Sequence, residues 1–67
     1  MSIDTIITAV RAHLVDCKSD TPLVRLEDLE RENGLDFLDA RRLCLEHPAE
    51  LRAAGLSFDA QRSWVLA

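Results

Sequence analysis

The sequence predicts a small, mainly helical fold with a C-terminal β-hairpin. Its 67 residues are 48% hydrophobic and 30% charged, which is the balance of a globular domain and not of a disordered chain. Apolar residues recur every three or four positions through most of the chain, as in amphipathic helices. Near the C-terminus they alternate with polar residues, as in strands. Because a chain of this length organises one core, we expect a single domain over residues 1–67.

The first predicted helix spans about residues 3–16. Ser2 is a favourable N-cap, and Asp4 lies in the first turn, where a carboxylate stabilises the helix dipole. Such a helix more often packs its apolar stripe into the core than against a second copy, but a homodimer through this helix is an alternative. The stripe consists of Ile3, Ile6, Ile7, Val10, Leu14 and Cys17.

Two short elements follow a polar connection over residues 18–22. The apolar tetrapeptide 23–26 is too short for a helix of its own and is compatible with a short strand. A brief helix is expected over residues 27–33, with two leucines directed inward. It ends at Gly34, because glycine adopts left-handed backbone geometry without penalty. The inward leucines are Leu26 and Leu29.

The next predicted helix spans about residues 37–47. Asp36 is its expected N-cap, and one face is apolar. Pro48 either ends this helix or begins a new turn, since proline is tolerated in the first turn of a helix and not in its interior. Residues 49–54 favour helix up to Gly55, a second stop signal. The apolar face consists of Phe37, Ala40, Leu43 and Cys44.

The C-terminal residues predict the hairpin. Its apolar segments are 56–58 and 64–66, and the polar residues 59–63 separate them. Trp64 is the one tryptophan in the sequence. We expect it to lie beside Phe58 across the hairpin and to pack onto the helices.

This order of elements resembles the winged helix-turn-helix superfamily, in particular biotin-repressor-like DNA-binding domains. Residues 26–35, LEDLERENGL, are similar to the first helix and the turn of that motif. Residues 51–56 followed by 64–66 are similar to the end of the recognition helix and the wing. The resemblance covers nearly the whole chain and implies a three-helix core with a hairpin wing. Pro48 departs from the family pattern, whose recognition helix usually runs without interruption, so this helix is expected to be kinked or split.

The resemblance also implies a set of DNA contacts. In the superfamily the second helix of the motif enters the major groove, and the wing contacts the backbone or the minor groove. The matching positions are Arg41 and Arg42 in the helix and Gln61 and Arg62 in the hairpin. Arginine suits them, since its planar guanidinium donates two hydrogen bonds to guanine or bridges phosphates. Alternatively, Arg41 and Arg42 are solvated partners of nearby acids, as Arg42 would be with Glu46.

The charge distribution supports a different interpretation. The net charge of −4 opposes non-specific attraction to DNA or to an anionic membrane. Residues 27–39 hold six acids and one arginine, a local charge of −5. These acids either cap and solubilise the helices or form a surface for a basic protein partner. The acids assigned to that alternative surface are Glu27, Asp28, Glu30 and Glu32.

Two cysteine–histidine pairs have the spacing of helical neighbours. Four such ligands suit tetrahedral zinc. Both cysteines also continue apolar stripes, however, where a free cysteine behaves as a small buried hydrophobe. A catalytic histidine would need a nucleophile and a substrate pocket, for which this chain offers little core volume. We therefore expect no metal, cofactor or enzymatic activity. The pairs are His13 with Cys17 and Cys44 with His47.

The resulting prediction is a small non-enzymatic binding module. The leading hypothesis is a DNA-binding or transcription-associated regulator that acts through the arginines and the wing. The alternative is a protein-interaction factor, such as an inhibitor or adaptor of the kind that phages and mobile elements encode. We expect a cytoplasmic protein with reduced thiols, because no signal-peptide pattern precedes the first helix. We expect no membrane partner, since the apolar stretches are too short to span a bilayer.

Overall fold

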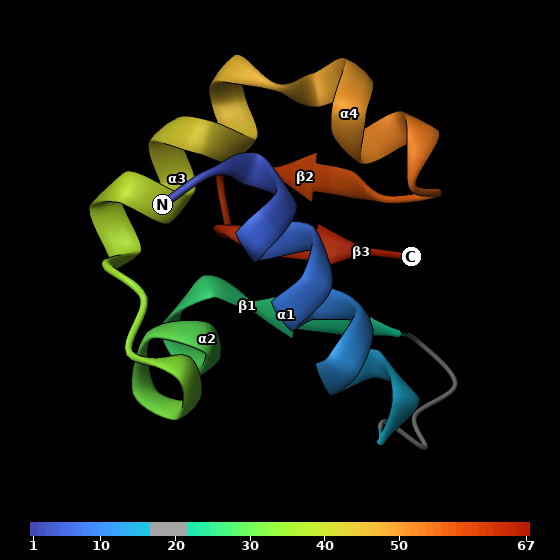
Figure 1. The fold of residues 1–67 in the computed structure, drawn as a ribbon. Helices are drawn as coiled ribbons and strands as arrows, with labels where there is room; N and C mark the ends of the chain where they lie inside the picture. Colours follow the sequence, from blue (N-terminus) through green and yellow to red (C-terminus); the bar gives the residue numbers. More distant parts are fainter. Residues whose placement is uncertain (17–21) are drawn as a thin grey trace.

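The computed structural model describes residues 1–16 and 22–67 of the chain. These residues form four helices and three strands, in the order α1, β1, α2, α3, α4, β2, β3 (Figure 1). The expected mainly helical fold with a C-terminal β-hairpin is confirmed. Within the described ranges, no helix combines the length and the apolar character that crossing a membrane requires. Cys17 and all but the last residue of the predicted 18–22 connection lie outside these ranges.

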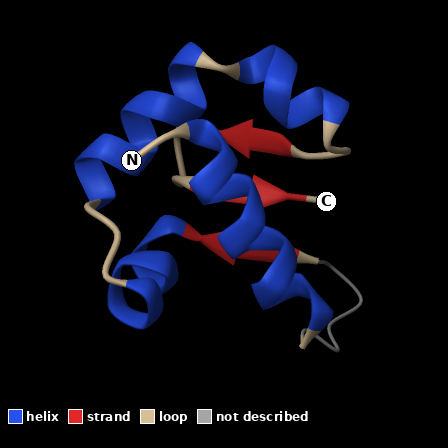
Figure 2. Ribbon diagram, in the orientation of Figure 1, coloured by secondary structure: helices blue, strands red, loops and turns tan. Residues whose placement is uncertain are grey.

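The three strands form one antiparallel sheet in the order β1-β3-β2 (Figure 2). They are β1 (Leu23–Arg25), β2 (Ser57–Asp59) and β3 (Trp64–Leu66). Both the short strand and the hairpin are therefore present as expected, with β2 beginning one residue later than predicted. The side chains form three cross-strand rows, and the middle row faces the core. The rows are Leu23–Leu66–Ser57, Val24–Val65–Phe58 and Arg25–Trp64–Asp59.

Trp64 does not lie beside Phe58, and this expectation was wrong. Trp64 pairs with Arg25 on one side and with Asp59 on the other, whereas Phe58 pairs with Val65. Successive side chains of a strand point to opposite faces of the sheet. A pairing shifted by one residue therefore exchanges the faces. Phe58 packs against the core, and Trp64 lies on the outer face of the sheet.

The first helix, α1 (Ile3–Val15), lies across the core-facing side of the sheet (Figure 1). Ser2 occupies the N-cap position, but its hydroxyl makes no capping bond and lies 3.4 Å from Thr5 Oγ1. The apolar stripe of α1 is used inside the molecule, where each aliphatic side chain contributes about 1.5–3 kcal/mol relative to exposure. Its buried residues are Ile3, Ile6, Ile7 and Val10.

Two helices of the central segment meet at a glycine corner. In α2 (Leu26–Asn33), Leu26 and Leu29 are fully buried, as predicted. Gly34 ends this helix in the left-handed conformation, with φ of 69°. The next helix is α3 (Phe37–Glu46), which begins and ends within one residue of the predicted bounds.

Pro48 begins a separate helix, α4 (Pro48–Ala53). A proline inside a continuous helix would remove one backbone hydrogen bond and conflict with the preceding turn. Between α3 and α4, His47 adopts φ of −125° and ψ of 54°, so the helix is split and not merely kinked. The buried Leu51 of α4 joins the core. The core is thus built from four helices of the described chain, where three were expected.

Candidate binding surfaces

Two carboxylates hold the N-terminus of α3. Asp36 Oδ1 accepts a hydrogen bond from the backbone N–H of Leu38 at 3.0 Å, so the predicted N-cap is confirmed. Glu30 Oε2, which projects from α2, accepts one from the N–H of Phe37 at 2.9 Å. Both donors belong to the first turn, where the helix supplies no acceptor of its own. These bonds fix α3 against α2 and therefore set the direction of its outward side chains.

Arg41 and Arg42 are both engaged by the protein's own groups. Arg41 is half-buried and donates from Nη2 to the carbonyl oxygen of Ala60 at 3.3 Å, which joins α3 to the turn between β2 and β3. Arg42 lies between two acids on the outward side of α3. Its guanidinium is 3.7 Å from Asp39 and 3.4 Å from Glu46, so the ion pair expected from the four-residue spacing is confirmed.

Asp59 organises the turn that carries the other two candidate DNA contacts. Its Oδ1 accepts hydrogen bonds from the backbone N–H groups of Gln61 and Arg62, at 3.0 and 3.2 Å. The Arg62 side chain reaches back to Asp59 Oδ2 at 3.5 Å and lies over the ring of Trp64. Within the described residues, Gln61 is thus the one candidate whose side chain makes no internal polar contact.

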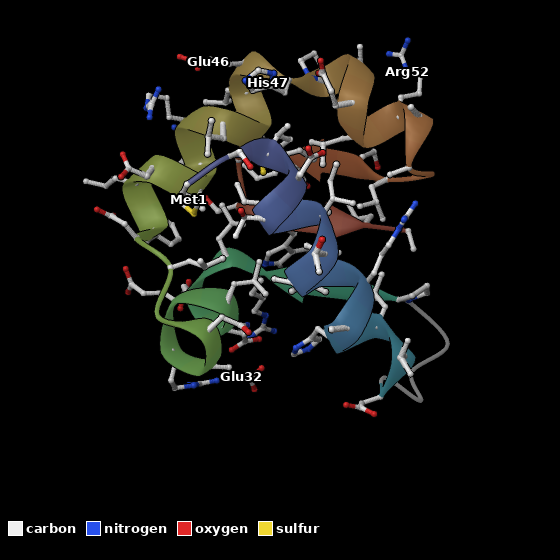
Figure 3. The ribbon with its side chains drawn as sticks, viewed as in Figure 1. Met1, Glu32, Glu46, His47 and Arg52 are labelled. Carbon is white, nitrogen blue, oxygen red and sulfur yellow. The ribbon has the colours of Figure 1, made fainter. Side chains whose placement is uncertain are left out.

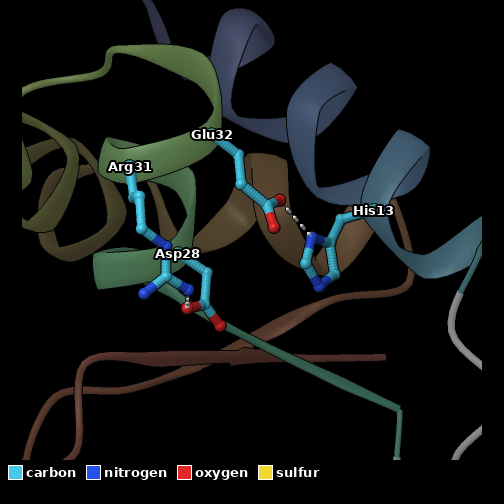
Figure 4. A network of polar contacts seen from close by, with 4 residues as sticks. All are labelled: His13, Asp28, Arg31 and Glu32. Atoms are coloured by element: carbon cyan, nitrogen blue, oxygen red, sulfur yellow. Dashed lines mark hydrogen bonds and ion pairs between the residues drawn. The ribbon is translucent and has the colours of Figure 1, made fainter.

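The acids of α2 mostly serve the fold itself (Figure 4). Asp28 Oδ1 lies 2.6 Å from Arg31 Nη2, and Glu32 Oε2 lies 3.1 Å from Nδ1 of His13, which ties α2 to α1. This second pair borders a hollow of about 410 Å³ between the two helices. A third acid of the segment caps α3, as described above. Glu27 is exposed and makes no polar contact with another described residue.

The outward face of α3 carries two exposed leucines. Leu38 is 73% exposed and Leu45 is 48% exposed, and a separation of seven residues places them two turns apart on one face. Beyond Leu45, a groove of about 270 Å³ runs between α3, α4 and β2. Arg52 is the one charged residue that lines it in the described part of the chain. The apolar lining includes Leu45, Pro48, Leu51, Phe58 and Ala60.

These two leucines were not identified as a surface from the sequence. The available signal was that positions 38 and 45 fall outside the predicted apolar stripe of α3. A leucine outside the stripe gains nothing from the core and therefore suggests another partner. No local sequence pattern predicts the groove, because it is formed by the packing of α4 beside β2.

The four residues considered as zinc ligands are not assembled in the described structure. Cys17 lies outside the described residues, and Cys44 is buried in the core. His13 pairs with Glu32, whereas Figure 3 shows Glu32 and His47 at opposite ends of the molecule. In residues 1–16 and 22–67, no three His, Cys, Asp or Glu side chains form a group suited to a metal ion.

No protein-family model, curated protein or solved structure matches this chain. What the chain does therefore has to follow from the surfaces described above.

Proposed function

We propose that the chain is a non-enzymatic, winged-helix-like module that binds a protein partner through the outward face of α3. The winged-helix interpretation is supported by the order of elements, which runs helix, strand, helix, turn, helix and hairpin, with α4 added after α3. The sheet order β1-β3-β2 also agrees with it. The observation that carries the binding proposal is the pair of exposed leucines on α3, of which Leu45 also lines the apolar groove.

Exposed leucines suit a protein partner better than a DNA groove. Covering one leucine contributes about 1.5–3 kcal/mol, and the cores of protein interfaces are depleted in charge. The major groove offers few apolar groups besides thymine methyls. On the same helix, Asp39 and Glu46 partly neutralise Arg42 and would lie near phosphates in a DNA complex.

The test replaces both leucines with a charged residue. We expect the double variant Leu38→Glu, Leu45→Glu to weaken partner binding at least about tenfold, since two carboxylates would be buried in an apolar contact. Immobilised wild-type and variant proteins would be exposed to extract from the native cells. Each retained protein would then be purified and its affinity measured by calorimetry.

The matched control is Val15→Glu, because Val15 is 83% exposed and lies on α1. All three positions are at the surface, so the variants should keep the circular dichroism spectrum and unfolding midpoint of the wild type. A partner that binds the double variant as tightly as the wild type would contradict the proposal. So would a partner lost equally in the control.

A second candidate function, duplex DNA binding, is favoured by the contact between Arg41 and Ala60. It brings α3 and the hairpin turn together, so that Arg41, Arg42, Gln61 and Arg62 lie on adjacent elements. A helix and a wing that contact one duplex need this proximity. The candidate ranks second because three of these four side chains are held by other groups of the protein.

Duplex binding would be measured by the fluorescence anisotropy of a labelled DNA at two salt concentrations. If this function is present, binding weakens as salt rises and is lost in the double variant Arg41→Ala, Arg42→Ala. The control is Arg52→Ala, which removes a positive charge from α4 and leaves the proposed contacts intact. Absence of binding at low salt and high protein concentration would rule out this candidate for the chain.

A further inference from the structure

The outer face of the sheet carries a group of side chains that the protein-partner proposal does not use and from which the duplex DNA candidate takes only Arg62. Of its six side chains, Arg25 and Ser57 are exposed and the other four are partly exposed. None of the helices described here covers this face, since all six would otherwise be buried. The partly exposed residues are Leu23, Asp59, Trp64 and Leu66.

Two guanidinium groups lie over the indole ring of this face. The guanidinium carbon of Arg25 lies 5.7 Å from the ring centroid of Trp64, and that of Arg62 lies 5.3 Å from it. These distances are within the range of cation–π attraction. A stacked guanidinium is held in one orientation while the N–H groups along its edge stay available as donors. The three side chains therefore form a preorganised set of planar surfaces and positive charges.

Arg25 differs from most arginines of the chain in having no acidic or carbonyl partner among residues 1–16 and 22–67. Arg31 and Arg42 pair with acids, and Arg41 is bound to a carbonyl oxygen. Among the described residues, no hydrogen bond or ion pair engages Arg25. The Arg62 side chain is 64% exposed, and its ion pair with Asp59 is long at 3.5 Å. Both arginines thus keep donors free for an anionic ligand.

We propose that this outer face binds single-stranded nucleic acid. Bases stack on aromatic rings and on guanidinium planes, and phosphates accept hydrogen bonds from guanidinium edges. Trp64 supplies the ring, and Arg25 and Arg62 supply both kinds of contact. Leu23 and Leu66 form the neighbouring row and extend the apolar surface for a second base or sugar.

The chemistry favours a single strand over other anionic partners. In a duplex the bases are already stacked on each other, so a flat aromatic surface gains little from them. An acidic polypeptide would use the two positive charges but would not need the planar stack. With Asp59 on the same face, the local charge is only +1, so stacking has to supply much of the affinity.

The test uses Trp64 as its own reporter, because it is the only tryptophan. Oligothymidylate would be titrated into the intact protein at low salt, with tryptophan fluorescence as the readout. We expect saturable quenching, since a stacked base lies against the ring, and weaker binding at higher salt. Arg25→Gln should lower the affinity about tenfold, since one phosphate contact and one stacking plane are lost. Arg25→Lys should recover only part of it, because it restores the charge and not the plane.

The control variant is Arg52→Gln, an equal change of charge on α4, which should alter the affinity less than about twofold. The double variant Leu38→Glu, Leu45→Glu should also bind normally, so failure here is separable from failure of the protein-partner proposal. The inference is overturned if oligothymidylate produces no saturable quenching, or if Arg25→Gln binds as tightly as the wild type. Equal competition by polyglutamate or by duplex DNA would overturn it as well.

Discussion

The chemistry of Cys44 follows from its position in the core. Its side chain lies on the core-facing side of α3 and is buried, and desolvation raises the pKa of the thiol to about 11. The thiolate is the reactive form of cysteine, both as a nucleophile and as a metal ligand. At pH 8, well below that pKa, the Cys44 side chain is almost entirely in the protonated thiol form.

We predict that Cys44 of the folded protein reacts slowly with an aromatic disulfide reagent at pH 8. Both the raised pKa and the burial slow the reaction of the thiol in the folded protein. Unfolding in guanidinium chloride removes both, so the reaction rate should then increase at least about a hundredfold. Measurement in the Cys17→Ser variant isolates the signal of Cys44. A folded-state rate that approaches the unfolded rate would show that the side chain is accessible.

At the scale of helices and strands, boundaries were predicted well wherever a local signal marks them. Gly34 ends α2 in the left-handed conformation, and Asp36 caps α3 through its own side chain. The sequence alone could not decide whether Pro48 ends the preceding helix or begins a new one. Neither position needs a backbone N–H from residue 48, so both accommodate a proline. In the structure a new helix begins at Pro48, and it places Leu51 in the core.

Face and register were predicted less well, because they depend on contacts between distant residues. Trp64 was assigned to the wrong face of the sheet. The hairpin pattern indicates which residues form strands, but it does not determine their pairing to within one residue. The same limit applies to the candidate sites. The Arg42–Glu46 pair spans four residues and was predictable from helical spacing. The Arg41–Ala60 and His13–Glu32 contacts each span 19 residues and have no local signal.

At the scale of the whole molecule, the apolar residues divide between one core and one surface. The described part of the α1 stripe that suggested a homodimer packs into the core, with Ile3, Ile6, Ile7 and Val10 buried and Leu14 partly buried. A seam between two copies would need these same side chains, which the core already uses. Four large hydrophobic side chains of the described chain remain exposed, and two of them lie on α3. They are Met1, Val15, Leu38 and Leu45.

We therefore predict that the isolated protein is a monomer whose mass by sedimentation equilibrium is close to 7.5 kDa. The exposed faces of Leu38 and Leu45 are small compared with the roughly 800 Å² that each partner buries in a stable interface, so two copies should not associate through them at micromolar concentration. If a dimer is nevertheless observed, the double variant Leu38→Glu, Leu45→Glu decides its origin. Dissociation by the variant would place the dimer on α3 and make a second copy the protein partner proposed above. A dimer that persists in the variant would contradict the monomer prediction and would show that the two copies meet through a surface other than these leucines of α3.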